Sequence, residues 1–331
     1  MEVLRGLEGA AGLSGSVVTV GTYDGVHLGH RALIGEARRR ASEAGLASVV
    51  LTFDRHPAAV LRPDRVPPLL TDLDDKLALL ATTGVDLVVV LTFDEQRANE
   101  SAEEFVSEVL VRGLRARQVV VGENFRFGHG RKGDVALLRE LGAVEGFEVV
   151  GWPLATDPSG QPVSSTRVRA LVHEGRVAEA AALLGRYHRL AGPVVPGDRR
   201  GGQALGMPTA NLLPPAGLAV PADGVYACWA DLPEGAGCFP AVVSVGDRPT
   251  FYGPGATRLL EAHLLGFAGD LYGQRLGLRF VERHRPQERF ADTAALRQAM
   301  VEDARWAAGR LAEDAPPDPL VGSPPGATAG P

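Results

Sequence analysis

The chain has 331 residues, a length that suits two domains better than one hydrophobic core. Its 45% hydrophobic and 22% charged residues are typical of a globular protein, and a net charge of −6 gives no general attraction to nucleic acid or to an anionic membrane. Two cysteines are too few for a disulfide framework, and no apolar run reaches the length of a signal peptide or a membrane span, so we expect a soluble cytoplasmic protein with reduced thiols.

The first half of the chain alternates short apolar runs with amphipathic segments. The apolar runs predict strands over Val17–Val20, Ser48–Phe53, Asp86–Phe93, Gln118–Val121 and Phe147–Gly151. The segments between them predict helices over 28–44, 71–83, 101–112 and 133–142, two of which begin with capping patterns at Thr71 and Ser101. Apolar strands separated by helices favour a parallel sheet covered on both faces, in which ligands bind at the carboxyl ends of the strands.

Residues 21–30 follow the first predicted strand and are the strongest candidate site. They read Gly-Thr-Tyr-Asp-Gly-Val-His-Leu-Gly-His and lead into a predicted helix, whose N-terminus favours a phosphate. His27 and His30 add donors that strengthen as charge builds on phosphorus, and Gly29 lets the backbone approach closely. Asp24 and Gly25 supply a tight turn before the histidines. The pattern indicates a nucleotidyl-transfer site, and the alternative is a pair of histidines that only cap or pack the helix.

Two further segments support a phosphate site. Residues 121–128, Val-Gly-Glu-Asn-Phe-Arg-Phe-Gly, follow the fourth strand and therefore share its sheet edge. Residues 164–169, Ser-Ser-Thr-Arg-Val-Arg, place hydroxyls and guanidinium groups at the start of a helix, which suits a second phosphate clamp. Taken alone, Ser164–Thr166 could be an N-cap and Arg126 a solvated surface charge.

From about residue 186 the pattern changes to short strand-like pieces broken by Gly and Pro. These pieces are Leu190–Val195, Gly224–Asp231, Pro240–Val245, Leu259–Phe267 and Leu276–Val281. Their spacing favours a small antiparallel barrel. A helix is expected over about Asp292–Leu311, with Leu296, Met300, Trp306 and Leu311 buried. From Ala315 the chain is rich in Pro, Gly and Ala, which predicts a disordered tail.

The second half carries a separate set of polar residues. Thr209 and Asn211 are two apart, so on an extended segment they face the same way, and their oxygens suit Mg²⁺ beside the phosphates of ATP. Glu261 lies in an apolar strand-like run, where a carboxylate could act as a general base during phosphoryl transfer. From the pattern alone, a solvent-facing Glu on an edge strand is equally compatible with the sequence.

Four segments of the first half, 21–30, 52–57 (Thr-Phe-Asp-Arg-His-Pro), 121–128 and 164–169, resemble the N-terminal adenylyltransferase module of bacterial bifunctional riboflavin kinase/FAD synthetases. The resemblance implies a Rossmann-like nucleotidyltransferase domain over residues 1–186, in which FMN attacks the α-phosphorus of ATP and pyrophosphate leaves. It also implies that Phe125 lies near the flavin. The residues that it implies for ATP and its phosphates are Gly21, Tyr23, Asp24, Gly25, His27, Gly29, His30, Asn124, Arg126, Ser165, Thr166 and Arg169.

Gly192–Leu212, Gly224-Val225-Tyr226, Gly246–Phe251 and Leu271-Tyr272-Gly273 resemble the C-terminal riboflavin kinase module of the same enzymes. The resemblance implies a six-stranded antiparallel barrel with a C-terminal helix over residues 187–312, followed by the tail 313–331. The roles that it implies are ATP binding by Gly206, Mg²⁺ and phosphate binding by Thr209 and Asn211, activation of the ribityl hydroxyl by Glu261, and flavin binding by Arg285. Gln203, Met207 and Asp247 depart from the basic residue, Phe and Thr that the family usually has.

Together these patterns predict a bifunctional enzyme that phosphorylates riboflavin to FMN and adenylylates FMN to FAD. Its co-substrate is ATP, its cofactor is Mg²⁺, and its expected partners are small molecules, with no nucleic acid and no membrane. A nucleotidyltransferase for another phosphorylated small molecule explains only residues 14–170. A class I aminoacyl-tRNA synthetase uses a similar His-x-Gly-His motif but needs a basic surface. A third alternative is a flavin- or nucleotide-binding regulator without catalytic activity. The near-complete set of reactive residues argues against it.

Overall fold

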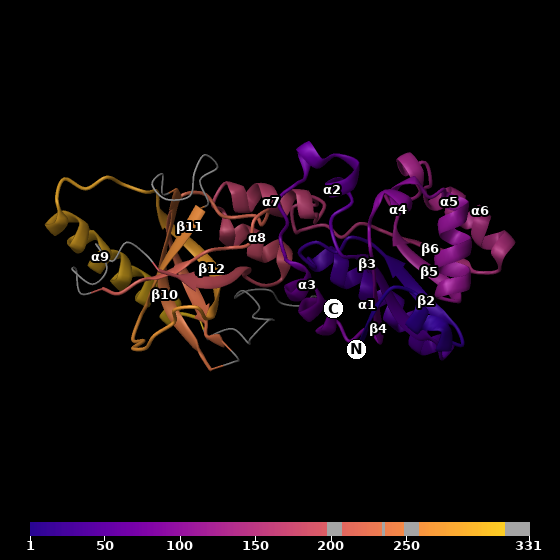
Figure 1. Cartoon of the computed structure of the whole chain (residues 1–331), viewed down its shortest axis with the longest axis horizontal. Coiled ribbons are helices and arrows are strands. Elements are labelled where there is room, and N and C mark those ends of the chain that lie inside the picture. Colours follow the sequence, from indigo (N-terminus) through magenta and orange to yellow (C-terminus); the bar gives the residue numbers. More distant parts are fainter. Residues whose placement is uncertain (197–206, 234–235, 248–257, 315–331) are drawn as a thin grey trace. The chain divides into compact units, whose positions relative to one another are not determined.

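The computed structural model describes residues 1–196, 207–233, 236–247 and 258–314. The chain forms two compact units, one built from Met1–Pro67 and Leu73–Ser164 and the other from Pro68–Asp72 and the residues from Ser165 onward (Figure 1). Within the described ranges, no helix is both long and apolar enough to cross a membrane.

The first unit is built on a six-stranded sheet whose strands are all parallel. The strand order is β1-β4-β3-β2-β5-β6, so the chain moves away from β2 in one direction through β3 and β4 and then crosses to the other side of β2 with β5 and β6. Such a reversal creates a crevice at the carboxyl ends of the strands. The strands are β1 (Glu2–Arg5), β2 (Ser16–Val20), β3 (Ala47–Phe53), β4 (Leu87–Leu91), β5 (Ala116–Gly122) and β6 (Glu148–Trp152).

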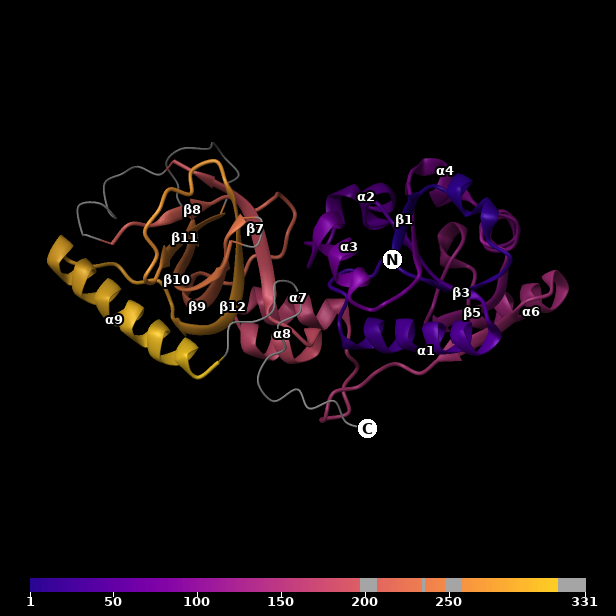
Figure 2. The same cartoon turned by 90° about the horizontal axis from the view of Figure 1, so that it is seen from below.

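Helices cover both faces of this sheet and form two hydrophobic cores (Figure 2). Alternate strand residues enter opposite cores, as Val17 and Val18 do on β2. Helices α1 (Leu28–Ala44) and α3 (Leu73–Ala81) close one core, and the π-helical η3 (Phe105–Gly113) and α6 (Val135–Glu145) close the other. The shorter elements are η1 (Glu8–Gly12), α2 (Ala58–Leu61), η2 (Pro63–Arg65), α4 (Glu95–Asn99), α5 (Ala102–Glu104) and η4 (His129–Arg131).

The second unit is a closed antiparallel barrel with strand order β10-β11-β8-β7-β12-β9. Its interior is filled by side chains such as Leu212, Val243, Leu260 and Phe280, which are fully buried. The strands are β7 (His188–Val195), β8 (Ala210–Leu212), β9 (Gly224–Asp231), β10 (Cys238–Asp247), β11 (Arg258–Leu264) and β12 (Arg275–Arg285). Helices α7 (Ser165–His173) and α8 (Val177–Leu184) precede the barrel.

The C-terminal helix α9 (Thr293–Ala312) packs on the outer faces of β9 and β10. The expected burial is correct for Leu311 and wrong for Leu296, Met300 and Trp306, which are only partly covered. The contact runs instead along a stripe of Asp303, Ala307 and Leu311, spaced four residues apart. Ala304 and Trp306 pack beside this stripe against the same core.

A segment from early in the chain belongs to the second unit. The Leu69 N–H donates to the Gly217 carbonyl at 2.7 Å, and the Ala219 N–H donates to the Leu69 carbonyl at the same distance. Asp72 forms an ion pair with Arg275 at 3.0 Å. The segment Pro68–Asp72 is therefore tied to the barrel unit by backbone and side-chain contacts.

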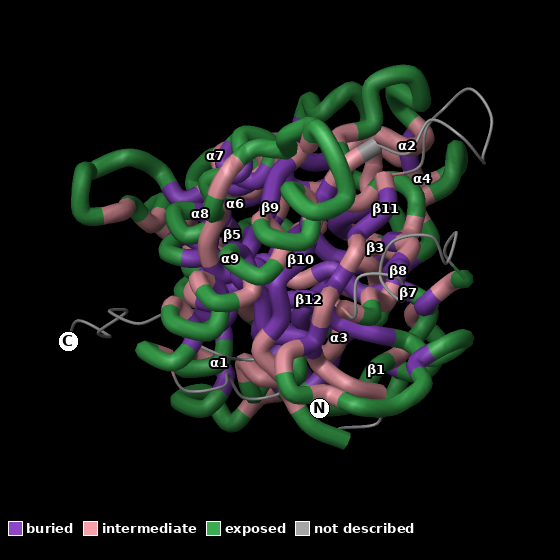
Figure 3. The backbone as a smooth tube through the Cα atoms, turned by 90° about the vertical axis from the view of Figure 1, so that its left-hand side faces the viewer, coloured by how far each residue is buried: buried purple, intermediate pink, exposed green. Residues whose placement is uncertain are grey.

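The predicted fold class is confirmed, including the parallel sheet, the barrel and the C-terminal helix. Each predicted strand and helix of the first half overlaps an observed one, and the Ser101–Glu104 capping box is present. The sequence pattern missed β1, β8 and several short helices. The predicted disordered tail from Ala315 lies outside the described residues. In the described ranges, strands of both units such as β2, β4 and β9 are buried along most of their length, whereas the edge strand β1 is largely exposed (Figure 3).

Leu260 is fully buried in the interior of the barrel. Leu260→Ala should lower the free energy of unfolding by about 2–5 kcal/mol, because it leaves a cavity among fully buried side chains. Urea unfolding followed by tryptophan fluorescence measures the change. Val301→Ala, at a position that is 36% exposed on α9, is the control and should shift the midpoint little. Equal midpoints for the two variants would contradict the packing described for the barrel.

Candidate active sites

The predicted site segments of the first unit meet at one edge of the sheet. Residues 21–30 join β2 to α1 and therefore lie at the carboxyl end of the central strand. The strands on either side are β3 and β5, whose carboxyl ends continue into residues 54–57 and 123–128. Three of the four segments singled out in the first half are thus neighbours at the crevice of the sheet.

The turn before α1 has an unusual backbone. Tyr23, Gly25 and Val26 all have positive φ angles, of 49°, 83° and 37°. This region is ordinary for glycine and strained for a β-branched valine, so surrounding structure must hold it. Val26 is fully buried, and Tyr23 is nearly so, with its hydroxyl 2.6 Å from the Thr19 hydroxyl. Burial raises the pKa of Tyr23 above its usual range, which keeps the phenol neutral.

His27 and His30 lie together at the N-terminus of α1. His27 is the N-cap, and its Nδ1 accepts a hydrogen bond from the His30 N–H at 3.3 Å. The two rings stack with centroids 3.6 Å apart, and Tyr23 packs edge-on against His30 at 5.1 Å. Gly29 makes room for this stack, because a Cβ there would lie 3.2 Å from the His27 ring. Imidazole donors, helix N–H groups and the helix dipole are thereby concentrated at one point.

Lys76, in the first turn of α3, is a residue of this edge that the sequence patterns did not predict. Its Nζ donates to the Phe53 carbonyl at 2.7 Å, to the Thr52 hydroxyl at 3.2 Å and to the Thr22 carbonyl at 3.4 Å. Burial lowers the pKa of Lys76 to about 8, and the charges of Asp24 and Asp54 act in the opposite direction. In the sequence, Lys76 is one polar residue of an amphipathic helix. The structure shows instead that it is buried and contacts three oxygen atoms, which makes it a candidate residue of the site.

The loop after β5 holds the residues predicted to lie near the nucleotide or the flavin. Asn124 is exposed, and a turn closed by the Phe125 N–H and the Gly122 carbonyl, 2.9 Å apart, presents it. Phe125 stacks on Phe127 with ring centroids 5.5 Å apart. Arg126 forms an exposed ion pair at 2.8 Å with Asp134, which caps α6. Phe125 therefore offers an aromatic surface, while Arg126 already has a carboxylate partner.

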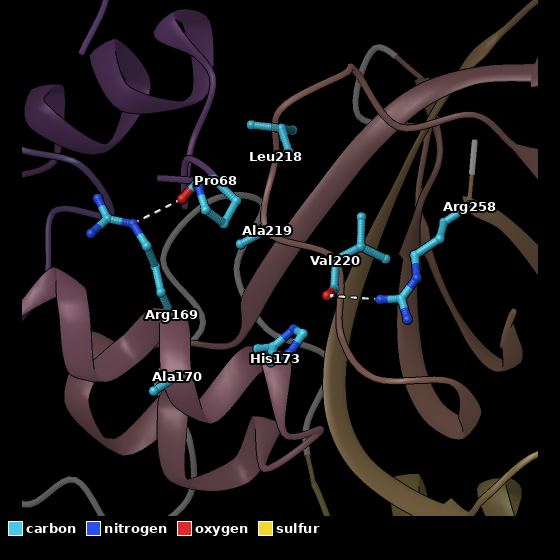
Figure 4. Close-up of a pocket in the computed structure, with 8 residues that line it drawn as sticks. All are labelled: Pro68, Arg169, Ala170, His173, Leu218, Ala219, Val220 and Arg258. Atoms are coloured by element: carbon cyan, nitrogen blue, oxygen red, sulfur yellow. Dashed lines mark hydrogen bonds between the residues drawn. The ribbon is translucent and has the colours of Figure 1, made fainter. Parts of the chain in front are cut away.

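Ser165, Thr166 and Arg169 lie on α7, which is part of the second unit. Arg169 Nε donates to the Pro68 carbonyl at 2.8 Å. Arg169 also lines a pocket of about 520 Å³ in this unit, together with Pro68, Ala170, His173, Leu218, Ala219, Val220 and Arg258 (Figure 4). The expected location of these α7 residues opposite His27 and His30 stays a prediction.

The barrel brings Asn211 and Glu261 side by side. They are directly paired across β8 and β11, and Ser244 of β10 pairs with Glu261 on its other side. The residues that flank them on each strand point into the barrel, so this polar row lies on its outer surface. Asn211 is 5% exposed, and its Oδ1 has no hydrogen-bond partner among the described residues. Thr209 lies two residues before Asn211, and Gly206 falls outside the described residues.

Gln287 and His263 make further contacts around this row, and the sequence patterns did not predict either contact. Gln287 Nε2 donates to the Ser244 hydroxyl at 2.6 Å and to the Val245 carbonyl at 3.1 Å. Gln287 follows β12 and Ser244 lies on β10, so only the folded barrel reveals the contact. His263 Nδ1 lies 2.8 Å from the Pro208 carbonyl, which ties the start of β8 to β11.

Arg285 is held by the C-terminal helix. It forms two hydrogen bonds to Asp303 of α9, at 2.9 and 2.7 Å, and Asp303 is only 5% exposed. Hydrogen bonding to this carboxylate raises the pKa of Arg285, and the guanidinium also lies 5.6 Å from the ring centroid of Phe290. These contacts give Arg285 a structural role, and its expected contact with flavin stays a prediction.

Comparison with known proteins identifies both units. A family model described as FAD synthetase matches residues 10–167, and one described as riboflavin kinase matches residues 184–311. The bifunctional riboflavin kinase/FMN adenylyltransferase of Escherichia coli (strain K12) is 37% identical over 305 residues, which are 92% of this chain and 96% of that protein. The protein of the same name from Pseudomonas fluorescens is 38% identical over 316 residues, which are 95% of this chain and 99% of its own length.

A solved structure supports the same architecture across nearly the whole chain. The crystal structure of a protein named as a macrolide-efflux protein from Streptococcus pneumoniae matches with a TM-score of 0.82 and 28% sequence identity, covering 93% of this chain and 99% of that chain. The likeness extends over both units, and the efflux name belongs to that other protein alone. Taken with the two family models and the curated relatives, the likeness leads to one conclusion: the chain belongs to the family of bifunctional riboflavin kinase/FMN adenylyltransferases.

Proposed function

We propose that this chain phosphorylates riboflavin to FMN and then adenylylates FMN to FAD, with ATP as the phosphate and the adenylyl donor. Residues 1–186 would carry the adenylyltransferase and residues 187–312 the kinase, with the tail 313–331 outside both. The observation that carries the proposal is that each family-matched segment has its own polar cluster. The first cluster surrounds His27 at the sheet edge, and the second surrounds Glu261 on the barrel.

In the adenylyl transfer, a phosphate oxygen of FMN attacks the α-phosphorus of ATP and pyrophosphate leaves. His27 and His30 donate hydrogen bonds to the phosphates, and the N-terminus of α1 adds its dipole. The close packing at Gly29 and the turn at Asp24-Gly25 support this role, because they keep both imidazoles at the helix end. The remaining proposed contacts come from Gly21, Tyr23, Asn124, Phe125, Arg126, Ser165, Thr166 and Arg169.

In the kinase reaction, the ribityl hydroxyl of riboflavin attacks the γ-phosphorus of ATP. Glu261 accepts the hydroxyl proton as this bond forms, and ADP leaves. Asn211 is paired directly with Glu261 across β8 and β11. We therefore assign Asn211 to binding the γ-phosphate of ATP, which the hydroxyl attacks. Gly206 and Arg285 are the further proposed ATP and flavin contacts of this site.

We propose Mg²⁺ as the cofactor of the kinase site, held by Thr209 and Asn211. The residues fit this ion because both offer neutral oxygen ligands, and the buried Asn211 Oδ1 lacks a hydrogen-bond partner in the part of the chain described. When bound, the ion neutralises charge on the ATP phosphates. The protein residues orient the hydroxyl and remove its proton.

Incubating the protein with riboflavin, ATP and Mg²⁺ and separating the flavins by chromatography tests the function. We expect FMN to appear first and FAD to follow, and we expect excess EDTA to stop FMN formation. Supplying FMN in place of riboflavin should give FAD directly. Recovery of unchanged riboflavin and unchanged FMN from the complete mixture would refute both proposed activities.

His30→Ala should separate the two activities. We expect FAD formation from FMN to fall by about 10²–10³-fold, because a donor to the reacting phosphates is removed. FMN formation from riboflavin should stay within about twofold, since that chemistry takes place on the barrel. His129→Ala, at an exposed position of η4, is the matched control and should leave both rates unchanged. Loss of both activities in a folded His30 variant would contradict the assignment.

Glu261→Gln should have the opposite effect. We expect FMN formation to fall by about 10²–10⁴-fold, because the amide keeps the shape of the side chain but cannot accept the hydroxyl proton. FAD formation from supplied FMN should persist. Glu313→Gln, whose side chain is 75% exposed at the end of α9, controls for the charge change. A Glu261 variant with wild-type kinase rate would exclude Glu261 as the base.

A further inference from the structure

Lys76 is the most deeply buried cation at the sheet edge of the first unit that has no role in the proposed chemistry. It is 8% exposed and is one of two lysines in the chain. Its ammonium makes three contacts with oxygen atoms, and the shortest, 2.7 Å to the Phe53 carbonyl, is within the range of a charge-assisted hydrogen bond. A lysine in this environment has given up most of its hydration, so its partners must compensate.

The partners of Lys76 belong to two different loops of the candidate site. The Thr22 carbonyl lies in the 21–30 segment after β2, and Thr52 and Phe53 lie at the carboxyl end of β3, where the 52–57 segment begins. One side chain of α3 therefore ties together the segment that carries His27 and its neighbour in the sheet. These carbonyls lie at strand ends, where the sheet no longer supplies a complete ladder of donors.

The charge of Lys76 also matters to the loops. Asp24 in the turn before α1 and Asp54 after β3 are the charged groups whose fields favour its protonated form. Asp24 is 4% exposed, and a buried carboxylate of this kind is stable only near positive charge or hydrogen-bond donors. The ammonium supplies positive charge beside both loops, because it contacts the Thr22 and Phe53 carbonyls.

We propose that Lys76 is a positioning residue of the adenylyl-transfer site, whose ammonium fixes the loops after β2 and β3 so that His27 and His30 face the triphosphate; this rests on the proposed function of that site. Lys76 touches neither substrate nor the reacting atoms. It acts through the Thr22 and Phe53 carbonyls. A misplacement of about 1 Å in such a loop costs roughly 10²-fold in rate, so the effect on FAD formation is large.

Lys76→Met is the test variant, because methionine keeps a long side chain and removes the charge and the donors. We expect FAD formation from FMN to fall by roughly 10–100-fold and FMN formation from riboflavin to stay within about twofold in the same preparation. Amide hydrogen exchange in residues 21–27 and 53–57 should become faster in the variant. Lys132→Met changes the other lysine, which is exposed, and should leave rates and exchange unchanged.

The pH dependence separates this role from simple packing. Burial places the pKa of Lys76 at about 8, so the amine is cationic below this pH and loses its charge above it. Wild-type FAD formation should therefore fall as the pH rises through about 8, and Lys76→Met should lack that limb. If the variant does not fold and loses kinase activity as well, Lys76→Arg decides, because it keeps a cation at this position that does not titrate near pH 8: loss of the limb in this variant supports the proposal, and an unchanged pH profile overturns it.

The outcomes also distinguish this inference from the proposed function. Wild-type protein that makes FMN but no FAD refutes the proposed adenylyl transfer, and the exchange comparison then decides the role of Lys76 alone. Faster exchange in both loops of Lys76→Met supports the fixing of the loops. Wild-type exchange in that variant, or an unchanged rate of FAD formation, overturns it.

Discussion

The first unit depends on the turn that joins β2 to α1. A parallel strand delivers its carboxyl end to the sheet edge, and a helix must begin there with its N-terminus facing the crevice. The chain makes this connection in few residues by adopting positive φ angles at Tyr23, Gly25 and Val26. Burial of Tyr23 and Val26 holds that backbone, and the stack of His27 on His30 follows from it. The strained turn thereby places the imidazole groups of His27 and His30 close together at the N-terminus of α1.

In the barrel, the position of the polar row depends on the register of the strands. Side chains alternate between the interior and the surface along each strand, so a polar row on the outside requires that β8, β11 and β10 pair without a slip. The observed register sets Asn211, Glu261 and Ser244 in line. A shift of one residue would turn Glu261 into the apolar interior and bring Leu260 to the surface. The interior packing of the barrel therefore also specifies its polar row.

Local patterns revealed most of the elements and both polar clusters, because those signals lie within a few residues. The His27–His30 motif and the capping box at Ser101 are examples. Strand β8 escaped prediction because it has three residues and lies between Pro208 and Pro214.

Features that depend on distant partners could not be predicted. Lys76 is significant only because β2 and β3 end beside it, and the partner of Arg285 lies on α9. The buried residues of α9 are Asp303, Ala307 and Leu311, and only the last is a large apolar residue, so the apolar pattern of the helix does not reveal this stripe.

The two units are not two consecutive pieces of sequence. The chain leaves the first unit after Pro67, adds Pro68–Asp72 to the barrel unit, and returns at α3. Leu69 satisfies the Gly217 carbonyl and the Ala219 N–H, so a barrel cut out at any single point after residue 164 would leave both groups without these partners. The returning helix carries Lys76 in its first turn, directly after the segment anchored by Asp72 and Arg275. Because the short stretch from Leu69 to Lys76 serves both units, its sequence is constrained by two separate sets of contacts.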